Sequence, residues 1–192
     1  KSTEDADYGK TEFGTMVISN PDIVQDAMIA TYNNTATITL GAGAVLKNYG
    51  GMSAVRISGG VLNMLDGSAI YDDLEGFTRS KGSTITGAEA GLYGPAGAVW
   101  LQGGSLSMEE GSEICDMVGR AVYADSGTVN INGTVSSIKS DTDMWQGTSG
   151  FIVHLRGNAA GTLGAAAVVD NNETVSGGDG CAVLGGCTLT GE

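Results

Sequence analysis

The stretch GSLSMEEGSEICD, residues 104–116, repeats the stretch GVLNMLDGSAIYD, residues 60–72, and the two copies are 44 residues apart. Extended toward the N-terminus, the common unit reads A-V-x-x-x-G-G-x-L-x-M-x-x-G-S-x-I-x-D. A supersecondary unit that recurs at a fixed period indicates a repeat architecture, in which each copy buries its apolar face against its neighbours.

Further copies of the unit occur elsewhere in the chain. They are spaced by 24 residues from Ile38 to Leu62 and by 23 from Leu106 to Val129. The 44 residues from Leu62 to Leu106 are interpreted as two steps, with KGSTITGAEA, residues 81–90, forming an irregular coil between them. We expect about eight coils and a rod of roughly 40 Å, since stacked strands are about 4.8 Å apart. The additional copies are ATITLGAGAVLKN from Ala36, AVYADSGTVNINGTVSSI from Ala121 and the partial GCAVLGGCTLTGE, residues 180–192.

Apolar and polar residues alternate within each unit, which is the period of a β-strand. Glycine makes up 32 of the 192 residues, roughly twice the usual share, and marks frequent tight turns. Short strands separated by G-G and G-S turns predict an all-β, three-sided solenoid with about 22–24 residues per coil. Four apolar pairs are expected to point inward: Ile38/Leu40, Leu62/Met64, Leu106/Met108 and Val129/Ile131.

The pattern resembles the right-handed parallel β-helix of the pectate-lyase-like superfamily. More closely, GGSLSMEEGSEICD, residues 103–116, is similar to the repeats of adhesin-like surface proteins from anaerobic bacteria. The resemblance covers about residues 36–140. It implies a right-handed parallel β-helix in a secreted or cell-surface bacterial protein that binds a polysaccharide or host glycan.

The two ends of the solenoid need separate treatment. Residues 36–192 are assigned to the β-helix, and residues 1–35 to an N-terminal cap or a first irregular rung of the same single domain. In NPDIVQDAMIATY, residues 20–32, Asn20 is a suitable N-cap and Pro21 a suitable first helical residue. Ile23, Ala27 and Met28 follow at helical spacing, so we expect a short capping helix, with an extra strand rung as the alternative. The opening KSTEDADYGK has no initiating Met or signal-peptide core, and we expect a piece of a longer protein.

Charge and cysteine content restrict the partners. The net charge of −13 repels phosphate backbones and anionic lipids, so nucleic acid is not expected as a partner. Direct membrane insertion is not expected either, because no apolar run approaches 18 residues. Flanking domains or a neighbouring copy of the chain remain as partners. Cys115, Cys181 and Cys187 form an odd set, interpreted as free thiols, with one Cys181–Cys187 disulfide as the alternative.

One column of residues carries the ligand-binding prediction. Arg56, Trp100, Tyr123 and His154 each lie between two apolar residues, and we expect them to project outward together as an exposed stripe. Aromatic rings stack on sugar faces, and Arg or His can donate hydrogen bonds to hydroxyls. The alternative is that a loop such as residues 141–150, or a neighbouring domain, covers these four side chains. The flanking apolar pairs are Val55/Ile57, Val99/Leu101, Val122/Ala124 and Val153/Leu155.

The turns supply a second column, Asn48, Asp72 and Asp116. Asn and Asp in stacked turns usually form hydrogen bonds with the nearby backbone, so no cofactor is expected. Calcium between the rungs is the alternative. The segment DNNETVSGGDG, residues 170–180, lacks the register of a calcium-binding loop and is interpreted as a plain loop.

Catalysis is not favoured, and no catalytic residue is assigned. The related lyases combine acidic calcium ligands with a basic residue, whereas here only Arg56 lies on an expected face near other candidates. Asp72–Asp73 and Asp141/Asp143 are carboxylate pairs of a kind common in turns. We therefore expect an adhesin-type glycan-binding module. The alternatives are a structural stalk or assembly module and, second, a polysaccharide lyase or hydrolase.

Overall fold

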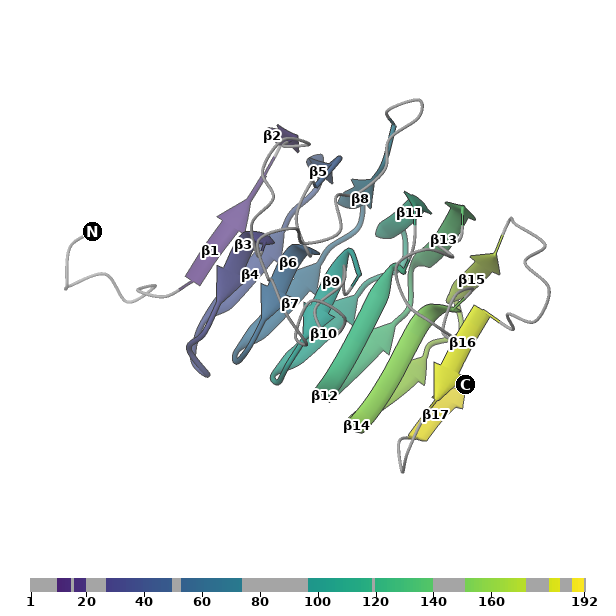
Figure 1. Cartoon of the computed structure of the whole chain (residues 1–192). Helices are drawn as coiled ribbons and strands as arrows, with labels where there is room; N and C mark the ends of the chain where they lie inside the picture. Colours follow the sequence, from purple (N-terminus) through teal and green to yellow (C-terminus); the bar gives the residue numbers. More distant parts are fainter. Residues whose placement is uncertain are drawn as a thin grey trace, which may run out of the picture.

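The computed structural model describes residues 10–14, 16–19, 27–49, 53–73, 97–118, 120–139, 151–171, 180–183 and 188–191. All regular elements in these residues are β-strands (Figure 1). Within these ranges no helix has the length and apolar character needed to span a membrane. The predicted all-β class is therefore confirmed for the described part of the chain.

The strands form two sheets. The 11-stranded sheet contains β1 (Lys10–Phe13), β3 (Ala27–Thr31), β4 (Thr37–Leu40), β6 (Ser53–Ile57), β7 (Val61–Met64), β9 (Val99–Leu101), β10 (Ser105–Met108), β12 (Val122–Ile131), β14 (Phe151–Leu163), β16 (Gly180–Val183) and β17 (Thr188–Gly191). The 6-stranded sheet contains β2 (Met16–Ser19), β5 (Ala44–Lys47), β8 (Ala69–Tyr71), β11 (Glu113–Val118), β13 (Thr134–Lys139) and β15 (Val168–Asn171).

Every strand pairing in the described residues is parallel. Successive copies of the repeat lie side by side, so that β4, β7 and β10 are neighbours in one sheet and β5, β8 and β11 in the other (Figure 1). The larger sheet curls because β12 is long: its first residues pair with β9 and its last residues with β10. This arrangement is compatible with a solenoid.

The two copies that define the repeat are direct neighbours. Leu62 of β7 pairs with Leu106 of β10, and the strands on either side, β6 with β9 and β8 with β11, pair in the same way. The expected coil between them, built on residues 81–90, is therefore wrong, because β7 and β10 hydrogen-bond directly and leave no space for it in the ladder. Residues 74–96 lie outside the described ranges.

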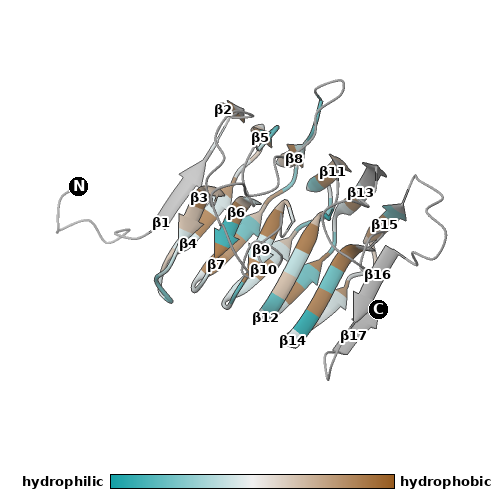
Figure 2. Cartoon of the chain, in the orientation of Figure 1, coloured by the Kyte–Doolittle hydropathy of each residue, from teal (hydrophilic) through white to brown (hydrophobic). Residues whose placement is uncertain are grey.

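The alternating pattern produces the core. Each of the eight residues expected to point inward on β4, β7, β10 and β12 is at most 6% exposed, and their polar neighbours are half-buried or exposed. Figure 2 shows the resulting alternation of brown and teal bands along the strands. Because the strands are in register, residues of one type stack from strand to strand: Ile38 on Leu62, Leu62 on Leu106, and Leu106 on Val129.

One glycine of the repeat, two residues before Leu62, Leu106 and Val129, is required by the backbone. Gly60, Gly104 and Gly127 have φ values of 88°, 73° and 95°, a region that other residues rarely adopt. A Cβ at each position would also meet a carbonyl oxygen of the turn on the preceding coil. The stacked turns therefore explain why this glycine recurs in the repeat.

The N-terminal segment differs from the expected capping helix. Ala27 and Met28 belong to β3, and Ile29 of this strand pairs with Val55 of β6. The strand alternative therefore holds for Ala27–Thr31, because pairing with β6 provides hydrogen-bond partners for the backbone N–H and C=O groups of this segment. Residues 20–26, including Asn20, Pro21 and Ile23, lie outside the described ranges.

Candidate functional site

The four predicted binding residues lie next to one another across the strands. Arg56 of β6 pairs with Trp100 of β9, Trp100 with Tyr123 of β12, and Tyr123 with His154 of β14. These residues are called the aromatic column below. The predicted common column is present, because the repeat places each residue at the same position of its coil. Arg56 and Trp100 are direct neighbours, whereas the sequence predicted a coil between them.

The predicted exposure of the aromatic column is wrong for three of its four members. Trp100 is 5% exposed, Tyr123 4% and His154 3%, and Arg56 is half-buried. The column does not belong to the main core, since Trp100 and Tyr123 form a separate buried cluster. Their binding role stays a prediction, but rings at this depth cannot present a face to a ligand as they stand.

Close packing among the side chains accounts for part of this burial. The guanidinium carbon of Arg56 lies 4.6 Å from the centre of the Trp100 ring, and that of Arg120 lies 5.1 Å from the centre of the Tyr123 ring. The His154 ring meets the Tyr123 ring edge-on, with centres 5.1 Å apart and planes at 86°. Both cation–π and edge-to-face contacts are attractive, and they bring neighbouring coils together.

A second line of side chains follows the aromatic column two residues further along the chain, within or directly after each strand. It consists of Tyr32, Ser58, Gln102, Asp125 and Arg156, and is called the polar row below. Tyr32 is 66% exposed and Arg156 is exposed, while the three residues between them are half-buried. The sequence prediction missed this row, although the period of two that selected the aromatic column also selects it.

The aromatic column holds the polar row at its Tyr32 end. Arg56 donates from Nε and Nη2 to Oε1 of Gln102, at 2.9 and 2.6 Å, and Ser58 Oγ donates to the same oxygen at 2.8 Å. The guanidinium carbon of Arg56 also lies 5.4 Å from the centre of the exposed Tyr32 ring. Arg56 therefore contacts two rings and orients the Gln102 amide.

At the other end, four side chains are linked by three contacts, and they are called the circuit below. Trp100 Nε1 donates to Asp125 Oδ2 at 3.0 Å, and the other carboxylate oxygen lies 3.3 Å from Arg156 Nε. Arg156 Nη1 donates to the hydroxyl of Tyr123 at 2.9 Å. Each polar-row side chain in the circuit is thus tied to a ring of the column. Contacts of this kind fix side-chain orientation before any ligand arrives.

A β-bulge lies beside this circuit. The register of β12 and β14 shifts between Ala124 and Ser126, and Gly157 supplies a residue with φ of 64°. Bulges redirect the side chains next to them and are frequent near functional sites. Here the bulge follows Arg156, whose side chain remains 48% exposed while it contacts Asp125.

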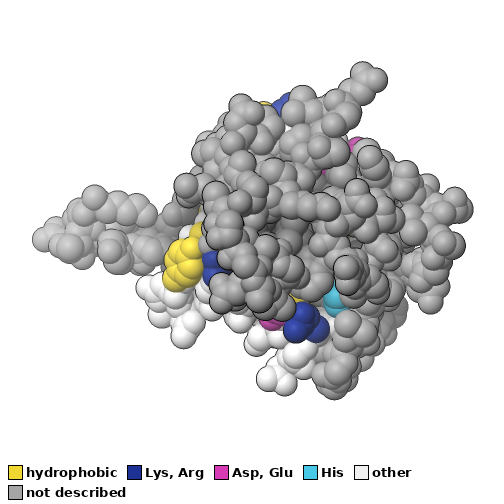
Figure 3. Space-filling view, viewed as in Figure 1, with side chains coloured by type: hydrophobic (Ala, Val, Ile, Leu, Met, Phe, Trp, Pro, Cys, Tyr) yellow, Lys and Arg dark blue, Asp and Glu magenta, His cyan; other side chains and the backbone are white. Residues whose placement is uncertain are grey.

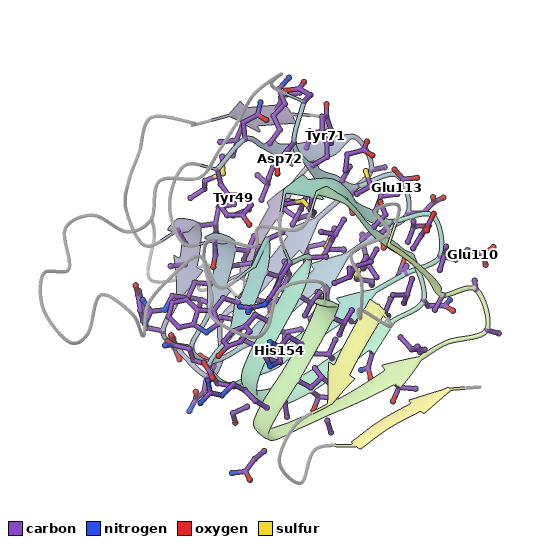
Figure 4. The ribbon with its side chains drawn as sticks, turned by 45° about the vertical axis from the view of Figure 1, so that its right-hand side comes forward. Tyr49, Tyr71, Asp72, Glu110, Glu113 and His154 are labelled. Atoms are coloured by element: carbon purple, nitrogen blue, oxygen red, sulfur yellow. The ribbon has the colours of Figure 1, made fainter. Side chains whose placement is uncertain are left out.

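The chain as a whole is acidic, but basic side chains gather around the aromatic column and the polar row. Three of the four arginines of the sequence lie here, Arg56, Arg120 and Arg156, and Asp125 is the acidic partner. Figure 3 shows basic side chains and the histidine gathered on the viewed face. In Figure 4 His154 lies toward the middle of the molecule, whereas Glu110 and Glu113 project at its edge.

Burial changes the titration of the site. The pKa of His154 is lowered to about 4, first by burial and then by the charges of Arg120 and Arg156. Burial raises the pKa of Tyr123, helped by the charge of Asp125, while the hydrogen bond from Arg156 opposes this. Both groups are therefore uncharged near neutral pH.

Of the turn column, Asn48 makes the kind of turn hydrogen bonds that the sequence predicted. Asn48 and Asp73 exchange hydrogen bonds, Asn48 Nδ2 to Asp73 Oδ1 at 2.6 Å and Asp73 N to Asn48 Oδ1 at 2.9 Å. The other carboxylate oxygen of Asp73 lies 2.7 Å from Lys47 Nζ. Asn48 and Asp116 both have positive φ, and Asp72 is buried. Within the described ranges no group of three His, Cys, Asp or Glu side chains could hold a metal ion.

Among the described residues, Cys115 and the acidic cluster are the remaining candidates. Cys115 is a free thiol whose pKa is raised to about 12, first by burial and then by Asp116 and Glu113, so the reactive thiolate is scarce. The acidic Glu109, Glu110 and Glu113 are exposed. Cys187 and the Asp141/Asp143 pair lie outside the described residues, as do loop 141–150 and residues 172–179 of the expected plain loop.

Comparisons with protein-family models, curated proteins and solved structures find no match to this chain. The candidate site is therefore argued from its own geometry.

Proposed function

We propose that the chain is a right-handed parallel β-helix with three strands per coil. Three ladders support this reading: β3, β6 and β9 stack in one, β4, β7 and β10 in the second, and β5, β8 and β11 in the third. Parallel crossovers are right-handed in nearly all proteins. The repeat also resembles that of adhesin-like surface proteins, as described above.

The function that the geometry supports best is binding of a linear polysaccharide or host glycan along the polar row, in a secreted or cell-surface bacterial protein. The single observation that carries this proposal is the row itself, in which an exposed ring, a hydroxyl, an amide, a carboxylate and a guanidinium follow one another within or directly after neighbouring strands. A tyrosine ring can stack on a sugar face, and the polar groups can exchange hydrogen bonds with hydroxyls.

The dimensions of the row suit an extended ligand. Its five residues lie within or directly after five neighbouring strands, so the row is about 19 Å long at the usual strand spacing. A polymer lying across the strands would meet one side chain per strand. The aromatic column then acts as a support that holds Gln102, Asp125 and Arg156 in place, which reduces the entropy lost on binding.

The experiment that tests this is a pull-down of the purified protein on a panel of insoluble plant polysaccharides and host glycans, with calcium or with a chelator. Tyr32→Ala and Asp125→Asn should each weaken binding about tenfold, equivalent to about 1.4 kcal/mol. Tyr71→Ala and Glu113→Gln are matched controls, since they remove the same groups from the other sheet. Equal losses in the control variants would assign the effect to folding, and the proposal would fail.

The burial of the aromatic column favours a second candidate, a structural stalk or assembly module that acts through its length, its flanking domains or a neighbouring copy. Trp100, Tyr123 and His154 are 3–5% exposed and strengthen the contacts between coils, as a stalk requires. If no glycan on the panel binds the wild type with or without calcium, the stalk becomes the leading account.

A further inference from the structure

His154 is placed where one additional proton would disturb the polar row. Three basic side chains surround the Tyr123 ring: Arg120 lies over its face, His154 meets its edge, and Arg156 donates to its hydroxyl. Of these three, only the imidazole changes its charge in acidic solution, because both arginines stay protonated. His154 is also the single histidine of the chain.

We infer that protonation of His154 releases Arg156 from Tyr123 and thereby disorders the polar row, so that ligand binding at the row is lost in acid. This regulation rests on the proposed function, but the structural change itself does not require a ligand. The direction follows from charge: a protonated His154 would be a third cation around one phenol ring, next to two permanent ones.

The charged and titratable groups around His154 come from three parts of the described chain. Tyr123 and Asp125 lie on β12, Arg120 immediately precedes that strand, and Arg156 lies on β14 with the histidine. Asp125 is the acidic group among them, and it already contacts Arg156. Arg156 is the more exposed of the two arginines and is free to move toward solvent, whereas Arg120 is 9% exposed.

The contacts of Arg156 and Asp125 would transmit this displacement along the polar row to Trp100. When Arg156 leaves, Asp125 loses its cation and keeps only the hydrogen bond from Trp100 among the contacts described above. The indole N–H of Trp100 therefore reports on the circuit. The lowered pKa of His154, about 4, places the transition below the usual histidine range.

The test is an NMR titration of the ligand-free protein from pH 7 to pH 3.5. The imidazole signal of His154 is unique, and the signal lost in Trp100→Phe identifies the Trp100 indole. We expect the Trp100 indole and the His154 imidazole to move with one midpoint near pH 4. In His154→Phe, which keeps an aromatic edge against Tyr123, the indole movement should be absent. His154→Gln serves if the Phe variant does not fold.

The outcomes separate this inference from the proposed function. The switch is overturned if the Trp100 indole signal shifts equally in wild type and in the His154 variants. It is also overturned if that signal does not follow the titration of His154. With a bound polysaccharide from the panel, the apparent affinity of the wild type should fall about tenfold for each pH unit below the midpoint. If the two signals move together but no glycan binds at any pH, the switch stands and the proposed function fails.

Discussion

Replacing His154 by Phe should make the fold more resistant to acid. The pKa of His154 is about 4 in the folded protein, against 6.5 for an ordinary histidine, so the unfolded chain binds the proton more readily. The stability contributed by the neutral histidine is fully present above pH 6.5 and is lost as the pH falls toward 4. The loss in the free energy of unfolding is about 2 kcal/mol at pH 5 and about 3 kcal/mol at pH 4. Screening around the exposed Arg156 brings the value at pH 4 closer to 2 kcal/mol.

The assay is urea unfolding of wild type and His154→Phe at pH 7, 5 and 4, followed by circular dichroism. Carboxylates that titrate in both proteins cancel in the comparison, so the difference between the two free energies of unfolding isolates the histidine. The wild type should lose 2–3 kcal/mol relative to the variant between pH 7 and pH 4. A difference that stays constant with pH would refute the reasoning, because His154 would then titrate alike in the folded and unfolded chains.

Three further predictions concern the repeat and its cysteine. Leu106→Ala should lower the free energy of unfolding by about 2–5 kcal/mol, because its side chain is fully buried; Ser107→Ala, on the opposite face, should change it by less than about 0.5 kcal/mol in the same urea assay. Gly104→Ala should cost at least about 1–2 kcal/mol through its positive φ alone, and a cost no larger than that of Ser105→Ala would contradict the stacked-turn account. Cys115 should react slowly with a thiol reagent at pH 8 in the native protein and rapidly in urea, because its pKa in the folded protein is about 12. Labelling is followed on the proteolytic peptide that contains Cys115, and rapid labelling of the native protein would contradict its burial.

The aromatic column shows how far sequence reasoning reaches at the candidate site. The repeat placed Arg56, Trp100, Tyr123 and His154 at one position of the coil, and the strands pair in that register. Their exposure was not predictable in the same way. Alternation assigns a side chain to one face of a sheet, but exposure depends on what packs against that face. Arg120, which lies over the Tyr123 ring, precedes its strand and is not part of the alternating pattern.

By itself the sequence determined the strand class, the inward residues such as Leu62 and Leu106, and the turn glycines, because these depend on local alternation and backbone sterics. The tertiary structure alone decided that residues 60–72 and 104–116 belong to neighbouring coils and that Ala27–Thr31 is a strand. It also decided that Asp125 and Arg156 meet within the polar row. Those outcomes depend on hydrogen bonds and ion pairs between residues on different coils. The repeat pattern along the chain does not give the distances between such residues.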